Sequence, residues 1–260
     1  MLQMFSHLPA FELVEPLQHA IANSNVVVGA PPGAGKSTIL PLALLQADID
    51  GKVLLMQPRR VVVRNLADFL AKQLGEQVGQ TVGYRIKGES KTSASTKLEI
   101  ITEGILSRMI QQDPELTGIG AIVFDEFHER SLNGDLGLAF CLEVAGALRD
   151  DLMLLAMSAT LDAGPVAALM EAPVVTSQGR SYPVETRWLD SPLPARARKL
   201  DALVDLVTRA EAETRNSGGG GGGLLVFLPG EGEIRRAAKN LEGRLPGDCL
   251  IQPLFGSLPF

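Results

Sequence analysis

Apolar runs alternate with segments of helical period over the first two thirds of the chain. The apolar runs have the length of strands that are buried on both faces. Because strand and helix alternate, we expect an α/β fold with a parallel sheet, right-handed crossovers and helices on both faces. The predicted strands are Asn25 to Gly29, Lys52 to Gln57, Leu98 to Ile101, Ala121 to Phe124 and Leu152 to Met157.

The pattern changes in the last third, where alternation at Val184, Thr186 and Trp188 predicts a strand of another unit. A second buried strand is expected at Leu224 to Leu228, after a flexible glycine loop at Gly218 to Gly223. These strands are too few to close a sheet like the first, so we expect a truncated domain. The predicted boundary lies near Gly179, with a first domain at 1–178 and the start of a second at 179–260.

Composition narrows the class of protein. The 260 residues carry a formal net charge of −6, which excludes a simple basic nucleic-acid binder. With 45% hydrophobic and 21% charged residues the chain is typical of globular proteins. No apolar stretch reaches the length of a membrane span, and Cys141 and Cys249 have no metal or disulfide spacing. We therefore expect a cytoplasmic protein with no membrane partner.

The sharpest motif is APPGAGKS at residues 30–37, between a predicted strand and an apolar helix. Its glycines let successive backbone N–H groups point at phosphate oxygens, and the helix N-terminus adds positive potential. A lysine in this position meets the β and γ phosphates, and the following hydroxyl binds Mg²⁺. The alternative is a simple Gly-Pro turn before a helix. The predicted phosphate-binding residues are Ala30, Gly33, Ala34, Gly35, Lys36, Ser37 and Thr38.

A second motif, Asp125-Glu126-Phe127-His128, follows the predicted strand at Ala121 to Phe124. Carboxylates at the carboxyl end of a parallel strand face the ligand crevice. We expect Asp125 to hold Mg²⁺, and Glu126 to orient and deprotonate the attacking water. The alternatives are a solvated acidic turn and, for His128, a structural hydrogen bond.

Together these motifs resemble superfamily 2 helicases of the DEAH/RHA group, most closely the bacterial HrpB type, whose box reads Asp-Glu-Phe-His-Glu-Arg-Ser. The resemblance covers nearly the whole chain and implies a RecA-like first domain. Each triplet alone is weak evidence, whereas six in the family's order are strong. The matching segments are 30–37, Gln57 to Arg60 (motif Ia), Thr102 to Gly104 (Ib), Asp125 to Ser131, Ser158 to Thr160 (III) and Leu225 to Ile234 (IV).

The resemblance also implies roles for residues outside the two motifs. Arg59, Arg60 and Thr102 contact the nucleic-acid backbone, for which paired guanidinium groups are suited. Arg85 and Lys87 correspond to a family loop that touches RNA, with a surface hairpin as the equal alternative. The coupling motif contains Ser158 and Thr160, expected to act through hydrogen bonds toward His128. Solvent-facing charge for the arginines and a helix cap for Thr102 are the simpler interpretations.

One position departs from the family, since Phe69 stands where many relatives carry an arginine that packs on adenine. The phenyl ring could stack on adenine, but an amphipathic-helix core position beside Leu66 and Leu70 is the favoured interpretation.

The resemblance implies an ATP-dependent RNA helicase core that uses ATP and Mg²⁺ and binds single-stranded nucleic acid, with RNA as the family's substrate. The arginine-finger motifs of the second domain are not found before Phe260, so we expect this chain to bind ATP far better than it hydrolyses it. Two alternatives remain open: a nucleotide-gated RNA- or protein-binding module without turnover, and a P-loop ATPase that is not a helicase.

Overall fold

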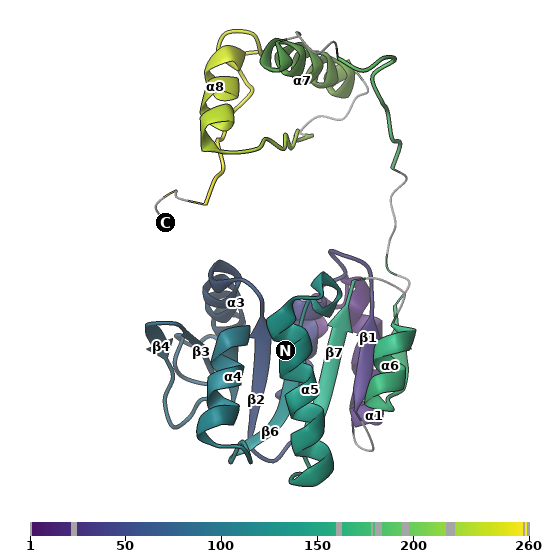
Figure 1. The fold of residues 1–260 in the computed structure, drawn as a ribbon, viewed down its shortest axis with the longest axis vertical. Helices are drawn as coiled ribbons and strands as arrows, with labels where there is room; N and C mark the ends of the chain where they lie inside the picture. The colour runs from purple at the N-terminus through teal and green to yellow at the C-terminus, as the bar shows by residue number, and fades with distance from the viewer. Residues whose placement is uncertain are drawn as a thin grey trace. The chain divides into compact units, whose positions relative to one another are not determined.

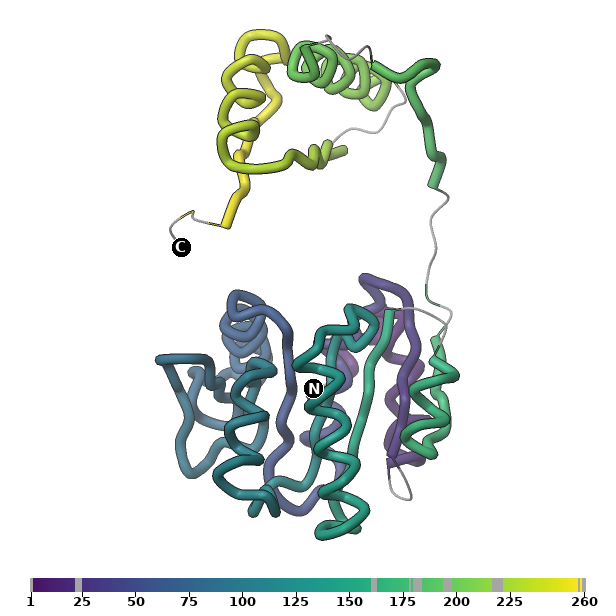
Figure 2. The backbone as a smooth tube through the Cα atoms, in the orientation of Figure 1, coloured from purple at the N-terminus to yellow at the C-terminus, as the bar shows by residue number. Residues whose placement is uncertain are grey.

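The computed structural model describes residues 2–21, 25–159, 163–177, 179, 184–193, 198–216, 222–256 and 258. The chain divides into two compact units, Met1–Pro183 and Val184–Phe260. Figure 2 follows the chain from purple to yellow through both units. Each unit is described by itself below. The interpretation of the second unit as the start of another RecA-like domain stays a prediction.

The first unit is built on an eight-stranded sheet with the order β4-β3-β5-β2-β6-β7-β1-β8 (Figure 1). Its pairs are parallel except for the antiparallel hairpin of β3 and β4 at one edge. The strands are β1 (Val26–Gly29), β2 (Lys52–Gln57), β3 (Val82–Ile86), β4 (Glu89–Lys91), β5 (Leu98–Thr102), β6 (Ile119–Phe124), β7 (Met153–Ser158) and β8 (Val174–Thr176).

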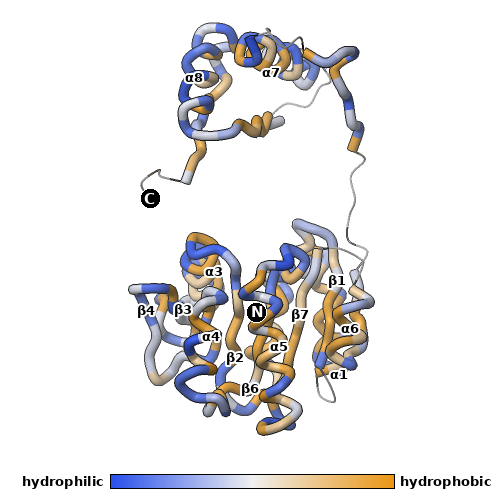
Figure 3. The backbone as a smooth tube through the Cα atoms, in the orientation of Figure 1, coloured by the Kyte–Doolittle hydropathy of each residue, from blue (hydrophilic) through white to orange (hydrophobic). Residues whose placement is uncertain are grey.

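Helices cover both faces of this sheet, and each face has its own apolar core. Helices α1 (Val14–Ile21), α2 (Lys36–Leu44) and α3 (Arg60–Gln73) pack on one face. The other face carries α4 (Glu103–Gln112), α5 (Leu132–Ala147) and α6 (Gly164–Met170). The central strands are hydrophobic along their length because both faces are covered (Figure 3). The predicted α/β class with helices on both faces is confirmed.

The register of the parallel pairs brings several strand ends to one edge. Gln57 of β2 lies opposite Thr102 of β5, and Gly29 of β1 lies opposite Ser158 of β7. Strand β6 pairs with β2 up to Phe124, and the next N–H, that of Asp125, donates to the Met56 carbonyl at 3.1 Å. The loops that follow these strands therefore lie together at the carboxyl edge of the sheet.

The N-terminal segment braces one of these loops. It contains short 3-10 turns at η1 (Leu2–Phe5) and η2 (Pro9–Leu13). The Ala10 N–H donates to the Ala34 carbonyl at 2.9 Å. Ser177, just after β8 and only 1% exposed, donates its hydroxyl to the Glu12 carboxylate. The first turns of the chain are thus tied both to the loop after β1 and to the end of the sheet.

The five strands expected from the sequence are present, with ends shifted by two residues at most. The hairpin at β3 and β4 corresponds to the segment for which a surface hairpin was an open alternative, but β3 is a sheet member. It pairs with β5, and Val82, Tyr84 and Ile86 are buried in the core beneath α3.

The second unit contains α7 (Lys199–Asn216) and α8 (Glu231–Leu241), which meet around Val204, Val207 and Leu241. The two strands predicted in this unit are not found. Trp188 and Phe227 are each 86% exposed, and the described residues of both stretches form no strand. A strand needs a neighbour to take its backbone hydrogen bonds, and the described part of this unit offers none. Most of the predicted glycine loop lies outside the described residues.

Within the described part of the chain, no helix combines the length and the apolar character needed to cross a membrane.

A single guanidinium organises the end of the sheet opposite the loops described above. Arg149 donates to the carbonyl oxygens of Glu115 (2.9 Å), Leu116 (3.3 Å) and Ile119 (2.9 Å), and it pairs with Asp151. Its side chain is only 19% exposed. These contacts fix the turn between α4 and β6, where Leu116 has a φ of 50°.

We expect Arg149→Ala to lower the free energy of unfolding by about 2 kcal/mol, because the part-buried carbonyl groups of Leu116 and Ile119 lose their donor. Urea denaturation followed by circular dichroism measures the change. The matched control is Asp151→Asn, which removes the exposed ion pair alone and should cost under about 1 kcal/mol. Equal losses in the two variants would contradict the role assigned to the carbonyl contacts.

Candidate functional site

The loop between β1 and α2 has the backbone of a phosphate-binding loop. Gly33 and Gly35 adopt φ values of 76° and 90°, in the left-handed region that favours glycine. A Cβ atom at Gly35 would also lie 2.8 Å from Cδ1 of Leu8. Helix α2 begins directly afterwards at Lys36. The sequence therefore forms the compact turn that aims a helix N-terminus at the carboxyl edge.

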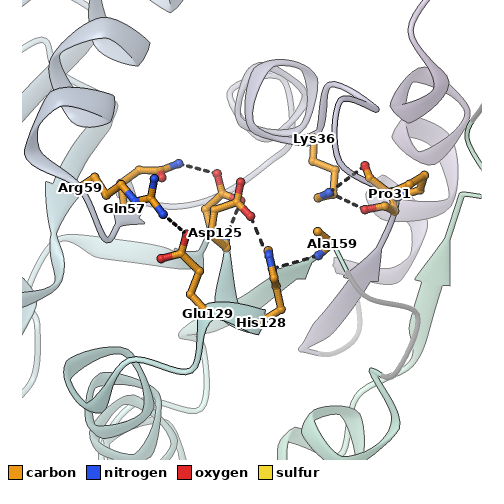
Figure 4. Close-up of polar contacts among 10 residues, drawn as sticks. Pro31, Lys36, Gln57, Arg59, Asp125, His128, Glu129 and Ala159 are labelled. Atoms are coloured by element: carbon orange, nitrogen blue, oxygen red, sulfur yellow. Dashed lines mark hydrogen bonds and ion pairs between the residues drawn. The ribbon is translucent and has the colours of Figure 1, made fainter. Parts of the chain in front are cut away.

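The side chain of Lys36 lies inside this loop and is 6% exposed. Its ammonium donates to the carbonyl oxygens of Ala30 and Pro31, the latter at 3.2 Å (Figure 4). Burial lowers the pKa of Lys36, while the charges of Glu126 and Asp125 oppose that shift. The lysine is thus held near two acidic groups that come from another strand.

Asp125 follows β6 and is 4% exposed. Its carboxylate accepts the backbone N–H of Glu126 at 2.8 Å, the amide of Gln57 and the hydroxyl of Ser37. Burial raises the pKa of Asp125, the charge of Glu126 raises it further, and these hydrogen bonds oppose both effects. The structure therefore brings together the two residues predicted as Mg²⁺ ligands, Ser37 and Asp125.

The two neighbouring acids have different environments. Glu126 has a φ of 52°, a left-handed conformation that is uncommon for a residue with a side chain. The chain therefore turns sharply at Glu126 before the 3-10 turn η3 (Phe127–Glu129). The Glu126 side chain is 37% exposed, whereas Asp125 is buried. This geometry leaves Glu126 accessible to water.

His128 connects the acidic motif to the end of β7. Its Nδ1 accepts the backbone N–H of Ala159 at 3.2 Å and lies 3.5 Å from Oε2 of Glu126 (Figure 4). A nitrogen that accepts a hydrogen bond carries no proton, so this contact favours the tautomer protonated at Nε2. The Ser158 carbonyl in turn accepts the N–H of Ala30 at 3.1 Å. The predicted coupling motif therefore contacts His128 and the P-loop through backbone atoms; Thr160 lies outside the described residues.

The predicted nucleic-acid residues lie near the same edge but differ in their contacts. Arg59 and Arg60 are exposed, and Arg60 donates to the Lys87 carbonyl at 3.2 Å in the β3–β4 turn. Thr102 occupies the N-cap position of α4 without a capping bond from its side chain. Arg85 differs, because its Nε pairs with Oε1 of the buried Glu99 at 2.8 Å.

The favoured core interpretation of Phe69 is wrong. Its side chain is 40% exposed, because the buried positions of α3 follow Val63, Ala67 and Leu70 around the helix. Sequence reasoning also missed specific partners within the quoted motifs: Gln57, Glu129 and Ala159. Glu129 accepts a hydrogen bond from Arg59 at 2.9 Å. Their signal lies in sheet register, which places the ends of β2, β6 and β7 side by side.

A parallel sheet with a glycine-bent phosphate loop after one strand and a buried aspartate after another defines a P-loop nucleoside-triphosphatase architecture. The chain belongs to the DEAD/DEAH box helicase family, whose model matches residues 14–169.

Two individual relatives show which members of the family the chain resembles. The chain is 50% identical over 256 residues to the ATP-dependent RNA helicase HrpB of Escherichia coli (strain K12), covering 97% of this chain and 31% of the relative. It is 33% identical to the ATP-dependent RNA helicase HrpA of Borreliella burgdorferi, covering 97% of this chain and 30% of that protein.

A crystal structure of the Escherichia coli DEAH/RHA helicase HrpB superposes with a TM-score of 0.87 at 48% identity. The match covers 96% of this chain and 31% of that structure. The chain thus spans about a third of the length of these two relatives. The RecA-like fold of the first unit is confirmed by this likeness.

The buried carboxylate of Asp125 predicts how the stability of the chain changes with pH. Because the pKa of Asp125 is higher in the folded chain than in the unfolded chain, its ionisation disfavours folding. The penalty is absent below the unfolded value of about 3.9 and becomes complete above the folded value. We therefore expect Asp125→Asn to be at least as stable as the parent chain at neutral pH without Mg²⁺, with an advantage that shrinks toward acid pH. Urea denaturation at a series of pH values measures it.

The control is a substitution at Asp113, for which we expect the opposite change in stability at neutral pH. Hydrogen bonds from Thr117 lower the pKa of Asp113, so its ionised form favours folding. The stability that Asp113 contributes is present above its unfolded pKa and is lost as the pH falls through the folded one. Asp113→Asn should therefore be less stable than the parent at neutral pH. A loss of stability in Asp125→Asn at neutral pH would show that its hydrogen bonds outweigh the cost of burial.

Proposed function

We propose that this chain forms the ATP-binding core of an ATP-dependent RNA helicase. The observation that carries the proposal is the convergence of Lys36, Ser37, Asp125 and Glu126 at the carboxyl ends of β1 and β6. These residue types meet the needs of phosphate binding, metal binding and water activation at one place. Family membership and the likeness to HrpB support the same activity.

The residues divide the work as follows. Backbone N–H groups of the loop bind the phosphates, and Lys36 exchanges the carbonyl groups of Ala30 and Pro31 for phosphate oxygens. Ser37 and Asp125 offer the hard oxygen ligands that Mg²⁺ prefers, and their contact in this structure fits such an ion. Mg²⁺, when bound, neutralises phosphate charge. Glu126, exposed beside the buried aspartate, orients the attacking water and takes its proton.

His128 is bonded to the end of β7 through the N–H of Ala159, and the carbonyl of Ser158 bonds the same segment to the P-loop. In the proposal, these bonds couple His128 to the nucleotide state of the site. Thr160 completes that coupling motif in the proposal. One contact joins two backbone atoms and the other joins a backbone N–H to the His128 imidazole, so a shift of either loop moves the other. We infer that this is how nucleotide state reaches the remainder of the molecule.

Single-stranded RNA is the proposed partner. Contacts to the phosphate backbone come from residues after β2, at the β3–β4 turn and after β5. Such contacts carry little sequence preference and make binding salt-dependent. Arg85 contributes less directly, because its guanidinium already pairs with Glu99. The residues proposed to contact the RNA directly are Arg59, Arg60, Lys87 and Thr102, and Arg85 is proposed to contribute less directly.

The test uses the 260-residue chain with Mg·ATP, in the presence and absence of single-stranded RNA. Lys36→Ala should weaken Mg·ATP binding at least tenfold, because the β and γ phosphates lose their cation. Glu126→Gln should bind Mg·ATP like the parent and abolish hydrolysis. We expect hydrolysis by the 260-residue parent to be slow, because no arginine-finger motif was found in its sequence and such a finger raises the rate of related hydrolases by about 10³–10⁵. Calorimetry and phosphate release measure the two quantities.

The outcomes separate the alternatives. RNA-stimulated hydrolysis that disappears in Glu126→Gln supports the helicase core. Tight binding of Mg·ATP and RNA with no hydrolysis at all would favour the nucleotide-gated binding module. Hydrolysis that persists in Glu126→Gln would refute the role assigned to that carboxylate.

A further inference from the structure

The arginine that the proposed function assigns to RNA already has an acidic partner. Nη2 of Arg59 donates to Oε1 of Glu129 at 2.9 Å (Figure 4). Arg59 immediately precedes α3, and Glu129 ends η3, the turn that also carries His128. The side chains are 69% and 35% exposed, so both can be reached from solvent.

A second contact lies two residues earlier, at the last residue of β2. Gln57, a residue that is 1% exposed, donates its side-chain amide to Asp125. The segment that leaves β2 is therefore bonded to the acidic motif at a buried point and at an exposed point. The buried contact fixes the two segments against each other. The exposed contact is the one that an incoming ligand can change.

The charges at the exposed point oppose RNA binding. A phosphodiester and a carboxylate compete for the same kind of guanidinium donor. Glu129 uses Nη2 of Arg59 and also adds a negative charge within a few ångströms of any phosphate bound to that group. An exposed pair of this kind contributes little to folding, so a phosphate can displace it.

We propose that Glu129 competes with the backbone phosphate of single-stranded RNA for Arg59. RNA capture then releases the end of η3 from the start of α3. Because η3 carries His128 and follows Glu126, release at Glu129 loosens a turn of the nucleotide site. This inference rests on the proposed contact between Arg59 and RNA, and it assigns to Glu129 a role in regulating that contact.

The experiment measures the affinity of the 260-residue chain for a fluorescein-labelled oligouridylate by anisotropy, without nucleotide. We expect Glu129→Gln to bind the oligonucleotide about two- to fivefold more tightly at low salt, the range of one exposed ion pair. The gain should shrink as salt screens the charges. Arg59→Ala should bind more weakly, with a salt slope smaller by about 0.7. In the Arg59→Ala background, Glu129→Gln should have no further effect.

The matched control is Asp135→Asn. Asp135 pairs with Arg130, the residue after Glu129, at 2.9 Å between Nη2 and Oδ2. The substitution removes the same charge from a neighbouring exposed pair, so it reports the effect of net charge alone. We expect the oligonucleotide affinity of Asp135→Asn to equal that of the parent, and the urea midpoints of all the variants to agree.

Three results would overturn the inference: no tighter binding by Glu129→Gln, equal tightening by Asp135→Asn, or tightening that persists in the Arg59→Ala background. A separate result would refute the proposed contact between Arg59 and RNA itself. If Arg59→Ala binds the oligonucleotide like the parent, Arg59 does not contact RNA, and both the contact and its regulation are refuted while the nucleotide site stands on its own test.

Discussion

The buried carboxylate of Asp125 is the constraint around which the site is arranged. With 4% exposure it has almost no water to solvate its charge, so the protein must supply donors. It obtains them from Ser37, Gln57 and its own neighbour Glu126. Those donors belong to the P-loop helix, the end of β2 and the acidic motif. Satisfying one buried charge therefore fixes three loops relative to one another.

The parallel sheet makes this arrangement possible, and the backbone at Glu126 completes it. Strands that run the same way end at the same edge, so their loops meet without long excursions. After Asp125 the chain must turn at once, which it does through the left-handed conformation of Glu126. Such a conformation costs of order 1–3 kcal/mol in a residue with a side chain. The sharp turn keeps one acid buried and its neighbour in contact with water.

The sequence pattern predicts those elements of the first unit whose structure depends on nearby residues. The strands of the first unit appear as apolar runs because both faces of the sheet are covered, and the P-loop is legible because its glycines and its helix start lie within eight residues. Strand β3 was harder to predict, since it contains Arg85, whose charge is accommodated by Glu99 on the adjacent strand β5. Only the pairing of the two strands reveals that partner.

The second unit shows the converse. Leu225 and Phe227 have the apolar pattern of a buried strand, yet they are 73% and 86% exposed. Strand formation depends on neighbours that accept its hydrogen bonds and cover its faces, and pattern alone supplies neither. For the same reason the positions of candidate site residues could be anticipated, while their partners Gln57, Glu129 and Ala159 could not. Those partners follow from sheet register.

Two kinds of contact link the parts of the site, and they differ in how readily they change. The links from Ser158 to Ala30 and from Ala159 to His128 use backbone atoms in half-buried or buried segments. The Ser158–Ala30 link joins two backbone atoms and does not depend on the side chains there, whereas the Ala159–His128 link ends on the imidazole of His128. The link from Arg59 to Glu129 uses two exposed, charged side chains, whose attraction is weak in water and sensitive to competing anions. In the proposed function, this combination of a rigid path toward the nucleotide and a displaceable one toward the phosphate backbone is what allows RNA to alter the nucleotide site without unfolding it.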